Sequence, residues 1–541
     1  VQLSFDSFNN LQSEITVGGP LTSSGNVRGL VAYSQANGQE FYDGGNTGSE
    51  AIYGNLVVDF SDRLTGKFYA YHEEASSLIN SGLPLGEDLT DPLNPVYSVV
   101  SYDEDFFASG DFSNQATRLS FAQATLEFQI MDSLSLHGIY SVIEGKQTRE
   151  DMEPAAFAYG DYVDLTPGSL TFGDVGLDVF STDRDVETNY GEIRLQGDTD
   201  IGPNATMDFY VSAEYYKFDR VFTDWAVDDS GVGTFNVFQR VGLANPFPSK
   251  QLDGFFAQDS EITSLSAVAS LDLFERLRLN LGYRYDDRKA RENYMDPSAI
   301  DVYDNSFTSK NASIVYDLTE NLHAFYAYGE GFEYLTTTTC DGSTLDPEQN
   351  ESHELGIKWE LADSVILSVT GFDNKSTNSP VNVICPAGSM FTFALENGTG
   401  EQFGKGVEIE AMGNITDAWN ISVGYSNIDD GNDYGGGPVS FVTPKETLTL
   451  YTIYDFLEGP LKGFGLGMGL RHGKNRPIEG DVVVPVHLAD VLGFDPEVDP
   501  GRTIDFNDSH DLGSYTVFDV SAYYRVNDNA DLALNIRNVT D

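Results

Sequence analysis

The sequence predicts an all-β fold, a transmembrane antiparallel β-barrel of the 22-strand type with about 21 strands present. Apolar and polar residues alternate with a period of two along much of the 541-residue chain, as half-buried strands require. The connections between the alternating segments are short and long in turn, which is typical of an outer-membrane barrel. No run of about 20 apolar residues occurs that could form a membrane-spanning helix.

The alternation is clearest over residues 205–218, where one face carries Ala205, Met207, Phe209, Val211, Ala213 and Tyr215. We therefore expect Val211 to face lipid and Ser212 to face the lumen. The same pattern recurs often enough to define 21 segments. They lie near residues 1–8, 10–18, 26–36, 50–60, 64–75, 115–130, 134–150, 185–200, 205–220, 258–274, 277–291, 306–318, 322–333, 352–361, 365–378, 400–414, 419–429, 445–456, 464–474, 515–526 and 530–541.

The connections support a barrel over soluble β folds. Tight turns such as 61–63, 131–133 and 527–529 follow even-numbered segments, and long loops such as 76–114, 151–184, 221–257, 334–351 and 475–514 follow odd-numbered ones. A β-propeller would show a repeat of about 40 to 50 residues, and we find none. Because bacterial single-chain barrels have even strand numbers, we expect one more strand beyond Asp541.

Composition excludes several classes of function. Lys and Arg total 30 against 85 Asp and Glu, so the formal net charge is −55, which argues against nucleic acid as a partner. The seven His residues are scattered without metal-ligand spacing, and no Ser has a convincing His and Asp context, so we expect neither a metal site nor an enzyme. The acidic loops 76–114 and 475–514 could bind cations, including calcium, or could simply suit a saline medium.

Loop aromatics are the candidate ligand-binding residues, because rings offer rigid contact area for a ligand of moderate size. Packing between loops is the alternative role for each of them. The candidates are Phe106, Phe107, Tyr159, Tyr162, Trp225, Phe235, Phe238, Tyr334, Phe391 and Phe393.

The only two cysteines, Cys340 and Cys385, fall in long loops after the thirteenth and fifteenth segments. Such loops should be neighbours on the rim of a barrel. An even pair of cysteines tends to close in an oxidising compartment, so we expect a disulfide between them. Two free thiols are the alternative.

Short motifs in a fixed order resemble the TonB-dependent outer-membrane receptors, most closely their ferric-siderophore branch. They are residues 327–332 (AYGEGF), 345–349 (LDPEQ), 353–359 (HELGIKW), 404–408 (GKGVE), 443–448 (TPKETL), 514–519 (SYTVFD) and 535–541 (NIRNVTD). The start of the chain, residues 14–28, is similar to the start of that family's barrel. Residues 1–541 are therefore expected to form the barrel domain, with the family's plug domain, TonB box and last strand absent from this chain.

The resemblance implies an active-transport receptor in the bacterial outer membrane that imports a scarce ligand. The ligand implied by the branch it resembles most is a ferric siderophore. Its implied partners are outer-membrane lipid, the TonB–ExbB–ExbD energy-transducing complex and the ligand, which carries Fe³⁺ itself, so no resident cofactor is expected. The barrel is expected to be monomeric. Heme, cobalamin or a carbohydrate as the TonB-dependent ligand, and a passive porin or structural barrel, are the alternatives.

Overall fold

The computed structural model describes most of the chain and leaves out parts of the long connections. The described residues are 2–6, 10–39, 46–78, 85–88, 90, 96–99, 114–154, 163–164, 167, 169, 174–227, 234–236, 250–294, 301–335, 339–341, 343, 345–361, 364–385, 393–398, 400–432, 444–475, 481–483, 503–505, 513–527 and 530–539. Among these residues, the structure contains no α-helix that could span a membrane.

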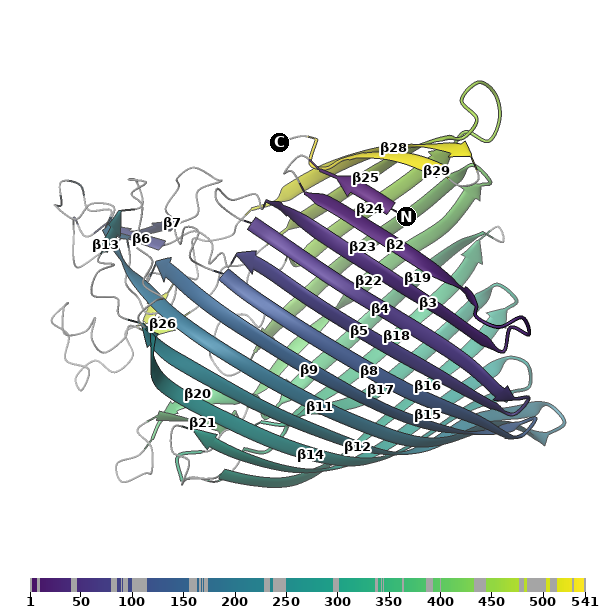
Figure 1. Cartoon of the computed structure of the whole chain (residues 1–541), viewed down its shortest axis with the longest axis horizontal. Helices are drawn as coiled ribbons and strands as arrows, with labels where there is room; N and C mark the ends of the chain where they lie inside the picture. Colours follow the sequence, from purple (N-terminus) through teal and green to yellow (C-terminus); the bar gives the residue numbers. More distant parts are fainter. Residues whose placement is uncertain are drawn as a thin grey trace.

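One antiparallel sheet of 21 strands forms the body of the molecule, and consecutive strands pair along the chain (Figure 1). β1 and β29 lie at its two edges, and in the described residues each pairs with one neighbour. The strands are β1 (Gln2–Phe5), β2 (Leu11–Pro20), β3 (Val27–Gln39), β4 (Asn46–Ser61), β5 (Leu64–Leu78), β8 (Asn114–Met131), β9 (Leu134–Pro154), β11 (Asp174–Gly202), β12 (Ala205–Val227), β14 (Lys250–Leu273), β15 (Leu277–Tyr294), β16 (Asp301–Thr319), β17 (Leu322–Glu333), β18 (Glu348–Leu361), β19 (Val365–Thr377), β22 (Glu401–Thr416), β23 (Trp419–Asn432), β24 (Glu446–Asp455), β25 (Phe464–Lys474), β28 (Tyr515–Asn527) and β29 (Ala530–Ile536).

All 21 predicted segments correspond to strands of this sheet, and the predicted barrel is confirmed. The main differences lie at the strand ends that lead into long loops. β11 begins at Asp174 rather than near 185, β14 begins at Lys250 rather than near 258, and β12 ends at Val227 rather than near 220. These extensions are held by backbone pairing with their neighbours. Their apolar alternation is short, as at Val175, Leu177 and Val179 of β11, so it did not extend the predicted segments.

The loops contain short strands that the sequence did not predict. β6, β7, β13 and β26 are visible at the long-loop rim, opposite the rim of tight turns (Figure 1). The loop strands are β6 (Leu85–Asp88), β7 (Val96–Val99), β10 (Val163–Asp164), β13 (Thr234–Asn236), β20 (Pro380–Ile384), β21 (Phe393–Asn397), β26 (Asp481–Val483) and β27 (Thr503–Asp505). β13 pairs with the extended start of β11, so part of the loop region continues the wall of the sheet.

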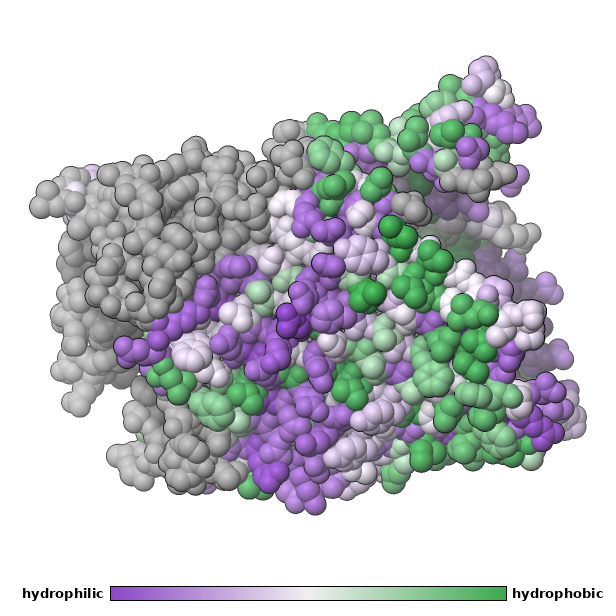
Figure 2. Space-filling view, viewed as in Figure 1, coloured by the Kyte–Doolittle hydropathy of each residue, from purple (hydrophilic) through white to green (hydrophobic). Residues whose placement is uncertain are grey.

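The two faces of the sheet differ as the alternation predicted. Val211 is 52% exposed on the outer face, whereas the neighbouring Ser212 is 2% exposed on the inner face. Outward apolar residues such as Ile193, Leu265 and Leu281 lie on the strands around Val211. Figure 2 shows hydrophobic residues gathered in the half of the wall nearer the tight turns, and hydrophilic residues mostly between them and the long loops on the left. The barrel wall therefore has an apolar belt with a polar outer extension.

Val211→Arg should destabilise the barrel by about 2–4 kcal/mol, because it places a charge on the lipid face near the middle of the belt. Ser270→Arg is the matched control, since Ser270 lies on the inner face opposite Asp208, which can pair with the new guanidinium. Ser212 is less suitable because its hydroxyl donates to Glu214 at 3.0 Å. Urea unfolding of both variants in lipid vesicles measures the difference. A larger loss for Ser270→Arg would show that the two faces are assigned in reverse.

Candidate ligand-binding site in the barrel lumen

A polar network covers the inner face of β11, β12, β14 and β15. Glu192, Glu214, Ser264 and Asp286 lie in register across these four strands. The Glu214 carboxylate accepts hydrogen bonds from Arg284 at 3.0 and 3.1 Å, as well as from two serine hydroxyls. Arg284 also donates from Nε to Asp286 at 3.0 Å. One guanidinium therefore neutralises carboxylates on two other positions of the wall.

The remaining charges of this network are paired as well. Glu192 is 4% exposed and Asp286 is 2% exposed, so an unpaired carboxylate at either position would be costly. Arg194 donates from Nε to Glu192 at 2.6 Å and from Nη2 at 3.0 Å. The carboxylates of Glu192, Glu214 and Asp286 are thus satisfied by arginines of the same wall.

A second group of arginines lies on the same wall, closer to the long loops. Arg184 of β11 and Arg220 of β12 share the inner face with Glu192 and Ser212, respectively, because they lie an even number of residues away. The guanidinium carbons of Arg184 and Arg220 lie 4.8 and 4.7 Å from the centroid of the Phe222 ring. Each of these arginines keeps a buried Nε without a hydrogen-bond partner. This part of the wall is therefore cationic and not self-satisfied.

Tyr334 belongs to an aromatic cluster on the inner wall beside a third arginine, Arg288. Its ring lies 4.9 Å from the guanidinium of Arg288, which is 4% exposed, and 4.9 Å from the ring of Phe332. Phe332 in turn lies 4.2 Å from the ring of Phe307. Burial, together with the charge of Asp286, raises the pKa of Tyr334 to about 12. Its hydroxyl is buried without a partner and remains a protonated donor at neutral pH.

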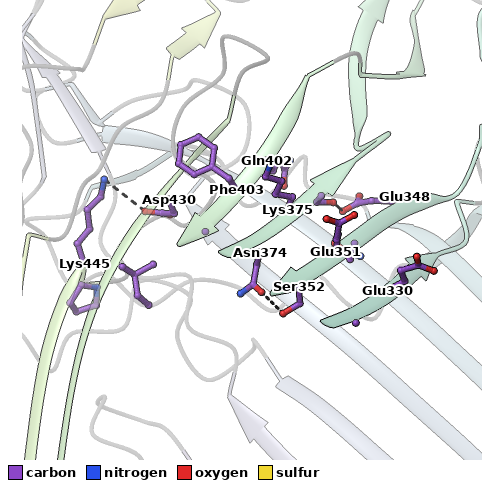
Figure 3. A pocket seen from close by; sticks show the side chains of 17 residues that line it. Glu330, Glu348, Glu351, Ser352, Asn374, Lys375, Gln402, Phe403, Asp430 and Lys445 are labelled. Carbon is purple, nitrogen blue, oxygen red and sulfur yellow. Dashed lines mark hydrogen bonds and ion pairs between the residues drawn. The ribbon is translucent and has the colours of Figure 1, made fainter. Parts of the chain in front are cut away.

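A groove of about 660 Å³ lies at the long-loop ends of β17, β18, β19, β22 and β23 (Figure 3). Ser352 donates to Asn374 at 2.6 Å, and Ser376 donates to Glu348. Lys445 lies 3.8 Å from Asp430 at the other end of the groove. The groove is therefore lined by neutral hydrogen-bonding groups and mostly paired charges, which suits a polar ligand of moderate size.

The two loops that border this region are joined covalently. Cys340 and Cys385 form a disulfide with a Cα–Cα distance of 5.4 Å, the pairing predicted from the sequence. Thr339 and Ser343 donate hydrogen bonds to Asp341, at 2.6 and 2.7 Å from their hydroxyls, and these hold the pKa of Asp341 at about 2. Asn397 also bonds the backbone of Asp346. The first loop is thus fixed to the second by a disulfide and by hydrogen bonds.

The structure describes only some of the predicted ligand-binding aromatics. Tyr334 lies in the inward cluster described above. Trp225 was predicted in a loop, and this was wrong because β12 extends to Val227; Trp225 shares the outward face of Val211 and donates to Asp183 at 2.9 Å. Phe235 and Phe393 lie in the loop strands β13 and β21. The other predicted positions, Phe106, Phe107, Tyr159, Tyr162, Phe238 and Phe391, lie outside the described residues.

Sequence analysis missed the arginines of the inner wall. Arg184 precedes the segment predicted from residue 185, while Arg220 and Arg288 occupy polar positions of alternating segments. The inward parity of Arg220 and Arg288 was readable from the sequence. Their contacts with aromatic rings and the charge of Glu292 that acts on both could not be read from it. In the part of the chain that is described, no group of three or more His, Cys, Asp and Glu side chains could hold a metal ion.

Comparison with known proteins identifies the family. The model of the TonB-dependent receptor-like β-barrel family matches residues 77–539. The chain belongs to this family. As a TonB-dependent receptor barrel it lies in the outer membrane, and its apolar outer belt is the lipid-facing surface. The alternation of tight turns and long loops is thereby explained as a membrane topology.

Several receptors of this family are similar to the chain over most of its length. A ferric-pyoverdine receptor, PbuA, from a Pseudomonas strain is 24% identical over all of this chain and 62% of its own length. The ferrichrome outer membrane transporter and phage receptor of Escherichia coli K12 is 24% identical over 62% of this chain and 44% of its own length. The chain thus spans less than two thirds of the curated relatives' length.

Solved structures share the fold. The receptor FpvA of Pseudomonas aeruginosa, solved bound to heterologous pyoverdines, superimposes with a TM-score of 0.82 at 19% identity, covering 100% of this chain and 67% of that one. The ferric-catecholate import receptor Fiu of Escherichia coli K12 gives a TM-score of 0.78 at 15% identity, covering 100% and 76%. The barrel architecture of this chain is that of these receptors.

The Cys340–Cys385 bond encloses 45 residues, so removing it should cost at most about 4 kcal/mol in the chain-entropy model, less where the intervening strands already constrain the loops. A thiol assay on the denatured, unreduced protein should find no reactive thiol. Denaturant titration of the Cys340→Ser/Cys385→Ser double variant measures the loss of stability. Two reactive thiols per chain in the first assay would refute the pairing.

Proposed function

We propose that this chain is the barrel of a receptor that binds a ferric siderophore outside the cell and imports it across the outer membrane with energy from TonB. The observation that carries the proposal is similarity along the full chain to a ferric-pyoverdine receptor, with ferrichrome and ferrioxamine B receptors among the other relatives. Heme, cobalamin or a carbohydrate would be alternative cargo for the same mechanism.

In this proposal the ligand enters from the long-loop rim and meets the inner wall below it. The groove at the ends of β17 to β23 and the cluster around Tyr334 both lie at this end of the lumen. The disulfide between the two neighbouring loops keeps their geometry fixed and reduces the ordering cost of binding. Fe³⁺ enters as part of the ligand and no covalent chemistry is required. We further expect a monomer that engages the TonB–ExbB–ExbD complex.

The full-length receptor should restore growth and ⁵⁵Fe uptake to an iron-limited host that lacks its own siderophore receptors. A panel of iron-loaded pyoverdine, ferrichrome and ferrioxamine B, with hemin and labelled cobalamin alongside, identifies the cargo. Uptake should stop when tonB is deleted. Import of hemin or cobalamin alone would replace the siderophore assignment, and uptake that persists without TonB would favour a passive porin.

Tyr334→Ala should weaken binding of the imported ferric siderophore by roughly tenfold, because it removes an aromatic contact surface and a phenol donor from the inner wall. The affinity of Tyr334→Phe should lie between those of Tyr334→Ala and the parent receptor, since phenylalanine keeps the ring but loses the hydroxyl. Trp225→Leu is the matched control, because Trp225 faces outward. Fluorescence quenching by the ferric siderophore measures each affinity. Equal affinities for Tyr334→Ala and the parent receptor would remove Tyr334 from the site.

A further inference from the structure

Arg184 and Arg220 form a pair of like charges on the inner wall, and no salt bridge joins either of them to a carboxylate of the described residues. Arg184 lies directly opposite Phe222 in the β11–β12 ladder, and Arg220 is two residues from Phe222 on the same face. Both guanidinium groups approach that one ring, at 4.8 and 4.7 Å from its centroid. Two cations placed this close repel each other, so the arrangement lowers the stability of the empty wall unless an anion joins them.

Aromatic rings hold the two arginines in position. The guanidinium of Arg220 lies 5.3 Å from the centroid of Phe256 and 5.8 Å from that of Phe218, in addition to Phe222. Cation–π contacts attract each guanidinium to a ring face but leave its N–H groups free in the ring-parallel plane. The charge is therefore positioned without being neutralised.

One nearby carboxylate offsets part of the charge of this pair. Glu292 shares the inner face and attracts Arg220, while the charge of Arg184 repels Arg220. The Glu292 carboxylate also accepts a hydrogen bond from Gln258. The pair therefore keeps part of its positive charge. Arginines of the deeper network behave differently, since Arg194 and Arg284 each bind carboxylates of the wall.

Further unpartnered polar atoms lie on the same wall. The Nε atoms of Arg184 and Arg220 and the hydroxyl of Thr182, two residues from Arg184 on the same face, are buried without partners. Nη1 of Arg288 and the Tyr334 hydroxyl are also unpartnered. Most of these groups are donors, and a buried donor without an acceptor costs free energy. The complementary group is an acceptor, and beside guanidinium it is an anionic oxygen.

We propose that Arg184 and Arg220 bind a carboxylate group of the imported ligand, with Arg288 and Tyr334 supplying further positive charge and a donor on the same wall. The proposal rests on the proposed import function and adds a ligand class to it, namely an anionic iron chelate with free carboxylates. A guanidinium presents two parallel N–H groups to a carboxylate, so the contact selects charge and geometry together.

Citrate, a tricarboxylate, is the probe for this site. Isothermal titration should show citrate binding to the chain in detergent, and Arg184→Gln/Arg220→Gln should weaken it by about ten- to a hundredfold through loss of charge-assisted hydrogen bonds. Arg184→Lys/Arg220→Lys should give a smaller loss of affinity, because lysine keeps the positive charge but lacks the two parallel N–H groups of guanidinium. Arg291→Gln is the matched control, since Arg291 lies on the outer face and pairs with Asp259 at 3.0 Å.

Near-ultraviolet circular dichroism establishes that each variant is folded before titration. Absence of citrate binding to the parent chain overturns the proposal. Equal citrate affinity of Arg184→Gln/Arg220→Gln and of Arg291→Gln overturns it as well. Citrate binding by this chain that the full-length receptor lacks would also overturn it, because an internal carboxylate would then occupy the arginines.

Uptake by the full-length receptor separates this inference from the proposed function. A receptor that imports no ferric siderophore refutes the proposed function whatever citrate does. A receptor that imports one, with an affinity unchanged by Arg184→Gln/Arg220→Gln, keeps the function and refutes the carboxylate site.

Discussion

Inside a lipid bilayer, each strand must place its backbone amide and carbonyl groups in hydrogen bonds to its neighbours, because no water is available to accept or donate them. The 21 strands meet this constraint through continuous antiparallel ladders, such as the one that pairs Ser181 with Trp225 and runs to Gly202 and Ala205. A fixed ladder also fixes the face of every side chain, since successive residues point to opposite sides. Val211 therefore faces lipid and Arg220 faces the lumen for the same reason.

The outer face of the sheet contacts lipid and the inner face contacts the lumen. This difference determines which side chains each face can carry. Outward positions in the belt need apolar side chains, whereas β11, β12 and β14 continue past the belt with polar outer residues such as Lys217 and Asp219. The ladders in this extension still hold the inner face in register. Arg184 and Arg220 lie on this part of the wall, so their rigid placement depends on strands that extend farther than lipid requires.

The sequence pattern predicted the strand segments that cross the lipid belt. It missed the strand ends that only backbone pairing defines. Alternation located all 21 strands because the lipid belt demands it, but it failed at Asp174–Arg184 of β11, where the alternation of Val175, Leu177 and Val179 is short and stops before Arg184. The same error placed Trp225 in a loop. Cys340 and Cys385 could be paired because strand order brings their loops together. The contacts of Arg184 and Arg220 with aromatic rings, rather than with salt-bridge partners among the described residues, could not be predicted. They depend on side-chain contacts between strands rather than on strand order.

A chain with a formal charge of −55 is an unexpected place for an anion-binding wall, but distance resolves the conflict. Charges on exposed loops are screened beyond about 8 Å at physiological ionic strength, so most of the acidic surface exerts little force inside the lumen. Partly buried groups at short range dominate there, because screening and solvation are weaker. Arg184, Arg220 and Arg288 outnumber Glu292, the buried carboxylate whose charge acts on two of them. They can therefore set the local potential while the surface as a whole stays acidic. An anionic chelate that reaches the inner wall is then held by nearby guanidinium groups, with the surrounding rings excluding water from the contact.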